Sequence, residues 1–200
     1  MHASRSVKIC ADFAQPSSRL GRDPVSNPDV MTIEVRPELE VDYYAIHRVN
    51  EMAFGRINEA DLVKALRQAA TPKISLVAVQ DCGIVGHIFF SPVSVESDTG
   101  LFTALGLAPM AVLPEYQRRG IGSELVREGL KACQRLGYDL VFVVGHPDYY
   151  PRFGFKPGRQ LGFDCEYAVP DEVFMVAELK PGAAGARNGM VRYMPQFRSV

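Results

Sequence analysis

The 200-residue sequence has neither an excess of one charge nor a long hydrophobic run. It contains 22 Lys and Arg residues and 23 Asp and Glu residues, which argues against a protein that mainly coats nucleic acid or an anionic membrane. No apolar run approaches the roughly 18 residues that a membrane-spanning helix needs. The longest apolar stretches, such as LVFVVG at 140–145, are typical of buried strands. We therefore expect no nucleic-acid partner and no membrane partner.

Cysteine is also scarce and widely spaced. The four cysteines, Cys10, Cys82, Cys133 and Cys165, form no C-x-x-C pair, and no two of them have the spacing of metal ligands. A structural zinc site is therefore not expected, and we expect no other bound metal. Because a chain of this length can bury enough core to fold without disulfide bonds, a reducing, cytoplasmic setting fits best.

Residues 1–30 lack the periodicity of the rest of the chain. They are rich in Ser, Pro, Arg and Asp, and they contain no apolar core of a secretory signal. Three aspartates in this stretch, Asp12, Asp23 and Asp29, argue against a transit peptide. We expect a disordered extension over 1–30, with Met31 as an alternative start of the chain.

The remaining sequence alternates strand-like and helix-like segments, a pattern that predicts an α/β fold. Strands are expected at 32–37, in two runs of 75–95 around the turn DCG, and at 101–114, 138–145 and 171–179. Helices are expected at 42–54, 58–70 and about 120–136. At the C-terminal end, 180–200, we expect a linker over 180–189 and a short strand in MVRYMPQF at 190–197.

Two of these strands are expected to be parallel neighbours. The segment 138–145 is apolar on both faces, which places it in the middle of a sheet, and the helix before it forms a strand–helix–strand crossover. Such crossovers are right-handed. Pro109 lies inside the preceding strand, and because proline has no N–H to donate, it predicts a bulge or an unpaired edge there.

The turn QRRGIGS at 117–123 has the chemistry of an anion cradle. It stands at the start of the predicted helix, where backbone N–H groups are unpaired and carry partial positive charge. A phosphate group can accept hydrogen bonds from these N–H groups, and its negative charge is attracted by their partial positive charge. Gly120 and Gly122 let the backbone approach a bulky anion, the two arginines attract it, and Ser123 can donate a further hydrogen bond.

Two better-known phosphate loops are excluded by spacing. The sequence has no G-x-x-x-x-G-K-[ST], and the turn lacks the third glycine of G-x-G-x-x-G and the acidic residue that binds ribose. From the residues alone, two readings stay open besides the anion cradle: a tight turn in which the glycines serve geometry, and a module that binds NAD or ATP.

The motif QRRGIG resembles the pyrophosphate-binding motif of the GNAT superfamily of acetyl-CoA-dependent N-acetyltransferases, Q/R-x-x-G-x-G/A. The segment YYPRFGF at 149–155 is similar to the later Y-x-x-x-G-F element of that family. The resemblance covers roughly 32–179 and is closest to small bacterial-type members. It implies an acetyltransferase domain at 31–179. Its sheet would be mixed and mostly antiparallel, with a bulged strand splayed from its parallel neighbour and helices on its faces.

The resemblance also implies acetyl-CoA as co-substrate and a site for it. The pantetheine arm would enter beside the bulged strand, and Tyr150 matches the family's general acid, which returns a proton to the thiolate. The side chain of Tyr149 is expected to point elsewhere. The residues implied in cofactor binding are Met110, Ala111, Val112, Gln117, Arg118, Arg119, Gly120, Ile121, Gly122 and Ser123.

The sequence identifies neither the acceptor substrate nor the general base. The acceptor would be a small-molecule or peptide amine, walled by the helices 42–54 and 58–70 and by the C-terminal segment. A non-catalytic acyl-CoA-binding or regulatory module is the alternative function. Family members are often dimers, and an exposed last strand could pair two copies. Candidate bases are His87, Glu96 and His146, Glu115 is expected to face solvent, and candidate acceptor contacts are Arg56, Asp61 and Tyr167.

Overall fold

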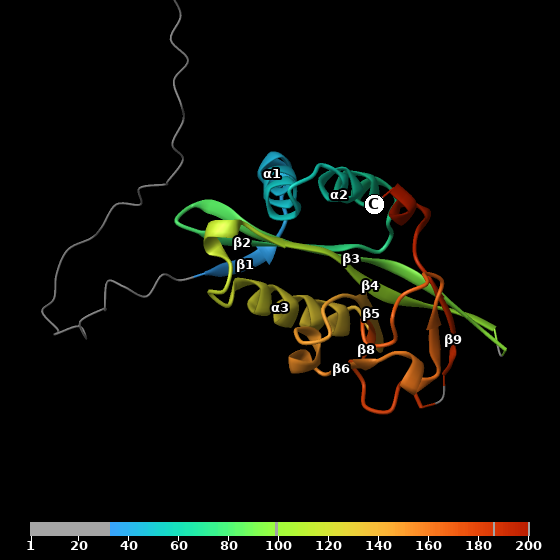
Figure 1. Cartoon of the computed structure of the whole chain (residues 1–200). Coiled ribbons are helices and arrows are strands. Elements are labelled where there is room, and N and C mark those ends of the chain that lie inside the picture. The colour runs from blue at the N-terminus through green and yellow to red at the C-terminus, as the bar shows by residue number, and fades with distance from the viewer. Residues whose placement is uncertain (1–32, 99, 186, 200) are drawn as a thin grey trace, which may run out of the picture. The chain divides into compact units, whose positions relative to one another are not determined.

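The computed structural model describes residues 33–98, 100–185 and 187–199. The expected extension over 1–30 lies outside the described residues. In the described part of the chain, strands of a single mixed sheet carry helices on both faces (Figure 1). Within these described residues, no helix is both long and apolar enough to cross a membrane.

The strands follow the order β1-β2-β3-β4-β5-β8-β6 across the sheet, with β9 joining β3 to β7. Neighbouring strands are antiparallel except for the parallel pairs β4–β5 and β7–β9. The strands are β1 (Glu34–Pro37), β2 (Ile74–Gln80), β3 (Gly83–Ser97), β4 (Gly100–Val112), β5 (Leu140–Val144), β6 (Phe155–Pro157), β7 (Phe163–Cys165), β8 (Phe174–Glu178) and β9 (Gly189–Arg192). The α-helices are α1 (Tyr43–Phe54), α2 (Asn58–Ala69) and α3 (Ile121–Arg135).

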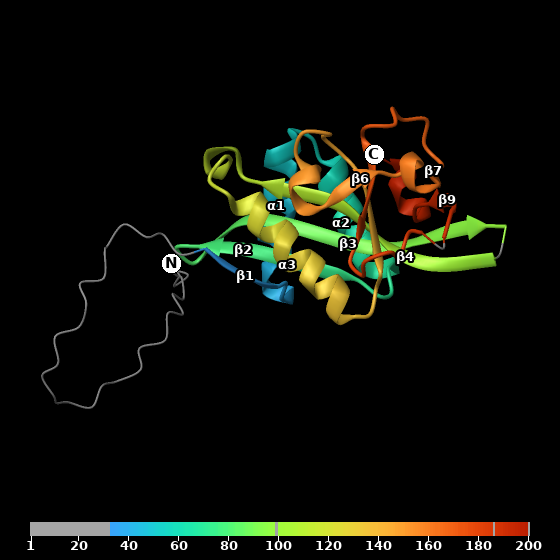
Figure 2. The same cartoon turned by 90° about the horizontal axis from the view of Figure 1, so that it is seen from below.

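The helices occupy both faces of the sheet because the strands are apolar on both. Helices α1 and α2 cover one face and α3 crosses the other, as the view from below also shows (Figure 2). Along β3, Phe89 packs toward α1 and α2, whereas Ile88 and Phe90 pack toward α3. Each such side chain stabilises the fold by about 1.5–3 kcal/mol when it is fully buried. The alternation of side chains along β3 therefore supplies two hydrophobic layers.

Helix α3 lies very close to the sheet. Its buried stripe includes Ile121, Leu125 and Cys133, which confirms the apolar spacing read from the sequence. A Cβ atom on Gly129 would lie only 2.4 Å from two ring carbons of Phe90, so glycine allows the contact between helix and strand. This packing fixes where the first turn of α3 stands relative to β4.

The predicted bulge is present in β4. The register against β3 shifts between Ile88 and Phe90, opposite the segment that contains Pro109. In the described part of the chain, β4 pairs with β5 only at Leu105↔Val141 and Gly106↔Phe142. Beyond Gly106 the two parallel strands separate. The mixed sheet with a bulged strand splayed from its parallel neighbour is thus confirmed.

The C-terminal part differs from its prediction. Strand β9 ends at Arg192, and a 3₁₀ helix, η5 (Pro195–Ser199), replaces the rest of the expected strand because Pro195 cannot donate to a sheet. Strand β9 pairs with β3 on one edge and with β7 on the other. The idea of an exposed last strand that pairs two copies is therefore wrong, since neither edge of β9 is open.

Candidate active site

A cavity of about 1060 Å³ opens where β4 and β5 separate. The bulged half of β4, the first turn of α3 and the end of β5 form one side of it. Residues of α1, α2 and η5 form the other side. The cavity therefore lies at the splayed strands, where the family resemblance implies the cofactor.

The first turn of α3 presents unpaired donors to this cavity. Gly120 is the N-cap residue with φ of +88°, a left-handed conformation that favours glycine, and no side chain of the described residues caps this end of the helix. The first intrahelical bond runs from the Glu124 N–H to the Gly120 carbonyl, at 3.0 Å. Ile121, Gly122 and Ser123 all line the cavity. Their N–H groups and the helix dipole form an anion-binding end.

The loop before α3 is held against the end of β4. The side-chain amide of Gln117 donates to the Val112 carbonyl at 3.0 Å. Arg118 adopts a left-handed φ of 62°, which costs a non-glycine residue about 1–2 kcal/mol. Both residues line the cavity. The strained backbone conformation at Arg118 thus lets the loop turn back toward the cavity.

Most of the residues expected to bind the cofactor meet at this cavity. Arg119 does not line it, and its guanidinium lies over the Tyr116 ring, 5.4 Å from the centroid. Ala111 also stays outside, with its side chain 3% exposed and its backbone opposite His87. The expected residues that do line it are Met110, Val112, Gln117, Arg118, Gly120, Ile121, Gly122 and Ser123.

Tyr150 lines the cavity from the turn after β5. Tyr150 is 7% exposed, and its ring packs edge-on against that of Phe155 with centroids 5.5 Å apart. A Cβ atom on Gly145 would lie 2.3 Å from the Cε2 atom of this ring. Burial, and then the neighbouring Tyr149, raise the pKa of the Tyr150 phenol well above its ordinary value. The hydroxyl therefore stays protonated at neutral pH.

Tyr149 occupies the same cavity, contrary to the expectation that it points elsewhere. Its ring is perpendicular to that of Tyr150, with centroids 5.1 Å apart. A Cβ atom on Gly122 would come 2.8 Å from the Tyr149 hydroxyl oxygen. The two adjacent tyrosines thus face one cavity, with Tyr149 next to the start of α3.

The structure removes His87 as a candidate base. His87 is 0% exposed, and its Nδ1 and Nε2 atoms lie 3.1 Å from Asn50 Nδ2 and 2.9 Å from Ser75 Oγ. Because Asn50 also donates to the Ile46 carbonyl, its nitrogen is the donor, so His87 carries its proton on Nε2 and donates to Ser75. Desolvation lowers the pKa of His87 to about 3, which keeps the ring neutral.

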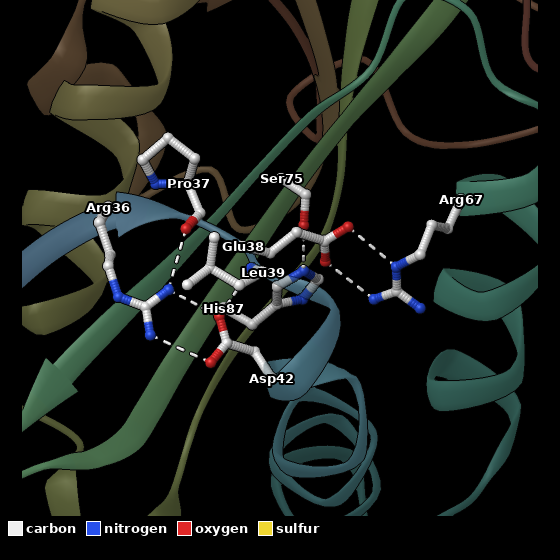
Figure 3. A network of polar contacts seen from close by, with 8 residues as sticks. All are labelled: Arg36, Pro37, Glu38, Leu39, Asp42, Arg67, Ser75 and His87. Atoms are coloured by element: carbon white, nitrogen blue, oxygen red, sulfur yellow. Dashed lines mark hydrogen bonds and ion pairs between the residues drawn. The ribbon is translucent and has the colours of Figure 1, made fainter. Parts of the chain in front are cut away.

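This histidine belongs to a polar network beside the start of α1 (Figure 3). Arg67 binds both carboxylate oxygens of Glu38 at 2.8 and 2.9 Å. Burial raises the pKa of Glu38, but hydrogen bonds from Arg67 and Ser75 outweigh it and hold that pKa below its ordinary value. The network joins β1, β2, β3 and the two helices, and it has a structural role.

The other candidate bases lie in different places. Glu96 pairs with Arg192 at 2.7 Å and does not line the cavity. Glu115, which was expected to face solvent, is exposed and also lies outside the cavity wall. His146, also exposed, does line it at the end of β5. Of the three candidates, only His146 therefore faces the cavity.

The α1–α2 side holds two residues that sequence reasoning missed, Glu59 and Phe197. Glu59 shares a helix stripe with Leu62 at a spacing of three, and this spacing could have placed it on the inner side. The residues expected there are elsewhere. Asp61 is 63% exposed beside His47, Tyr167 packs on Tyr193 at 5.6 Å, and Arg56 pairs with Glu59 from outside the cavity wall.

Among the residues that the structure describes, no group of three or more His, Cys, Asp or Glu could hold a metal ion. The cavity instead offers backbone donors, arginines, a buried phenol and one buried carboxylate, from Glu59. These groups can bind a polyanion at one end and donate a proton near it.

Comparisons with known proteins agree with this geometry. Residues 34–158 match the acetyltransferase (GNAT) domain family. The chain is 40% identical over 130 residues to the N-acetyltransferase YjhQ of Escherichia coli K12, which covers 64% of this chain and 72% of YjhQ. It is 32% identical over 164 residues to the N-acetyltransferase YhbS of the same strain, covering 82% of this chain and 97% of YhbS.

Two solved structures extend the comparison to the fold. The structure of Escherichia coli YhbS in complex with CoA has a TM-score of 0.80 and 31% identity, covering 86% of this chain and 96% of YhbS. A GNAT family acetyltransferase from Brucella melitensis in complex with acetyl-CoA has a TM-score of 0.69 and 33% identity, covering 84% and 99%. The chain therefore belongs to the GNAT family of acetyltransferases.

Proposed function

We propose that this N-acetyltransferase moves the acetyl group of acetyl-CoA to a primary amine by direct attack of the amine on the thioester. One observation carries the proposal: the uncapped first turn of α3, the splayed strands and Tyr150 all face a single cavity. The two related proteins were solved in complex with CoA and acetyl-CoA, which supports acetyl-CoA as the acetyl donor.

The cofactor would be held by backbone groups more than by side chains. The N–H groups of 121–123 and the guanidinium of Arg118 would take the diphosphate, and Gly122 keeps the approach open. The pantetheine arm would run along the unpaired edge of β4 at 110–112. A backbone N–H of that segment would stabilise the oxyanion, which Pro109 cannot do because it has no N–H.

Tyr150 would act as the general acid. Attack of the neutral amine forms the new C–N bond, and collapse of the tetrahedral intermediate breaks the C–S bond and releases a thiolate. The thiolate takes the phenol proton of Tyr150, and the nitrogen releases its proton to solvent. Burial raises the pKa of Tyr150, so the phenol carries this proton at neutral pH and regains it readily after transfer.

Replacement of Tyr150 by Phe tests this role. We expect kcat to fall about 100-fold, while the Kd for acetyl-CoA stays within about twofold. Tyr138→Phe is the matched control, because Tyr138 packs against the same core but does not line the cavity. Full activity of Tyr150→Phe would exclude Tyr150 as the general acid.

Two other outcomes would indicate the alternative functions. Acetyl-CoA binding without thiol release for any amine would indicate a non-catalytic module. Stabilisation by ATP or NAD alone would indicate a nucleotide-binding module.

We also propose a cytoplasmic location. Cys133 and Cys165 are free thiols, as expected in a reducing compartment. Burial raises the pKa of the Cys133 thiol to about 12, so this side chain is an inert part of the core.

A further inference from the structure

The two ends of the cavity carry opposite charge. Arg118 and Arg152 line the end at α3, together with the positive end of the helix dipole. The one acid on that side, Asp148, is exposed, and its main-chain carbonyl accepts a hydrogen bond from Arg152 at 3.1 Å. Glu59 is the acid that lines the α1–α2 side. The polarity suits an anionic cofactor at one end and a cation at the other.

Glu59 is placed to bind a cation from inside the cavity. Its side chain is 7% exposed, whereas that of its partner Arg56 is 57% exposed. Arg56 Nε contacts Oε1 and Oε2 at 3.0 and 3.1 Å, and Nη2 makes a short contact to Oε1. Two of these three contacts reach Oε1 and one reaches Oε2, so Oε2 keeps a lone pair that can accept a hydrogen bond from another donor.

The wall around Glu59 is apolar. Phe54 keeps 41% of its surface exposed although it is a large hydrophobic side chain, and Phe197 closes the wall from η5. A ligand that covers such surface gains roughly 25 cal/mol for each Å² of apolar area removed from water. The apolar residues on this side are Ala53, Phe54, Leu62 and Phe197.

We propose that the acceptor is a cationic amine attached to an apolar body, and that the Glu59 carboxylate is the residue that selects it. The inference rests on the proposed acetyl transfer, since it assigns the amine half of that reaction to the α1–α2 side. Glu59 binds the ammonium group, which loses a proton to solvent before the neutral amine attacks the thioester, and the apolar wall holds the remainder of the molecule. Amines that carry a carboxylate are poor acceptors, because the Glu59 carboxylate offers a second carboxylate no hydrogen-bond donor.

Three ligands of one length test the proposal on the wild-type protein. Binding of hexylammonium, 1-hexanol and hexanoate is measured by calorimetry at neutral pH, with the protein saturated with CoA. We expect hexylammonium to bind at least about 10-fold more tightly than the other two, as one hydrogen bond to a charged group allows. Equal affinity for hexylammonium and hexanol, or a preference for hexanoate, overturns the proposal. Failure of CoA to bind would instead count against the proposed function.

A pair of variants assigns the effect to Glu59. Glu59→Gln should weaken hexylammonium binding about 10-fold and leave the Kd for CoA unchanged. Asp61→Asn is the control, because Asp61 is an acid of the same helix that does not line the cavity. Unchanged hexylammonium affinity in Glu59→Gln overturns the assignment. The wild-type ligand series requires no substitution, so it decides the proposal even if Glu59→Gln folds poorly.

Discussion

The hydroxyl oxygen of Tyr149 lies 2.8 Å from the position that a Cβ atom on Gly122 would take. The same Cβ position is 3.7 Å from the Cε atom of Met110. The first turn of α3, the tyrosine turn and the bulged strand therefore meet around one glycine. This glycine leaves room for the Tyr149 hydroxyl and for Met110 beside the cavity that we assign to the cofactor.

Gly122→Ala should weaken acetyl-CoA binding without unfolding the protein. Alanine is favoured over glycine in a helix by up to about 1 kcal/mol, but its methyl group would press on the Tyr149 hydroxyl. We expect the Kd for acetyl-CoA, measured by calorimetry, to rise about 10-fold with little change in melting temperature.

The double variant Gly122→Ala with Tyr149→Phe isolates the cause. Removal of the phenol oxygen relieves the contact, so the double variant should bind more tightly than Gly122→Ala alone. If Gly122→Ala binds acetyl-CoA as the wild type does, this glycine has no role in shaping the site.

Strong local signals let the sequence predict much of this fold. The three helices have regular apolar spacing, and Pro109 and the glycine turn each carry a specific backbone consequence. Strands β6 and β7 were not predicted, because three residues are too few to show an alternation. Their pairing is decided by neighbours that are distant in sequence, β8 and β9.

The site was harder to predict where it depends on which face a side chain takes. His87 is one residue away from Ile88, yet it turns toward α1 whereas Ile88 turns toward α3. Consecutive side chains of a strand always point to opposite faces, but which face His87 takes depends on strand register, which a single sequence does not define. In the same way, the sequence motif singled out Tyr150 but not the fact that Tyr149 shares its cavity.

Buried His87 should make the protein sensitive to acid. Desolvation lowers its pKa from 6.5 to about 3, with Glu38 opposing and Arg67 adding to the shift. Between these pH values the unfolded imidazole binds a proton and the folded one does not. Stability is therefore fully present above pH 6.5 and should fall as the pH drops toward 3, by up to about 1.4 kcal/mol per pH unit.

Denaturant melts of wild type and His87→Gln at several pH values measure this effect. A glutamine amide can still accept from Asn50 and donate to Ser75, but it does not titrate. We expect the free energy of unfolding of His87→Gln to be nearly flat from pH 6.5 to 4.5, while that of the wild type falls. Asp42 and Glu38, whose pKa values are lowered, contribute only at lower pH. Parallel curves for the two proteins would show that His87 is not the acid-sensitive group.

Phe197 should link the C-terminal segment to acceptor binding. It is 9% exposed, packs with α2 residues such as Leu62 and also lines the cavity. Phe197→Ala should lower the free energy of unfolding by about 2–3 kcal/mol, less than a fully enclosed Phe, because the gap opens onto the cavity. In steady-state kinetics, the KM for an amine should rise several-fold while the KM for acetyl-CoA stays constant. Phe102→Ala is the control, since Phe102 packs in a separate cluster and does not line the cavity. Equal increases in both KM values for Phe197→Ala would show that η5 supports the whole site and does not specifically wall the acceptor.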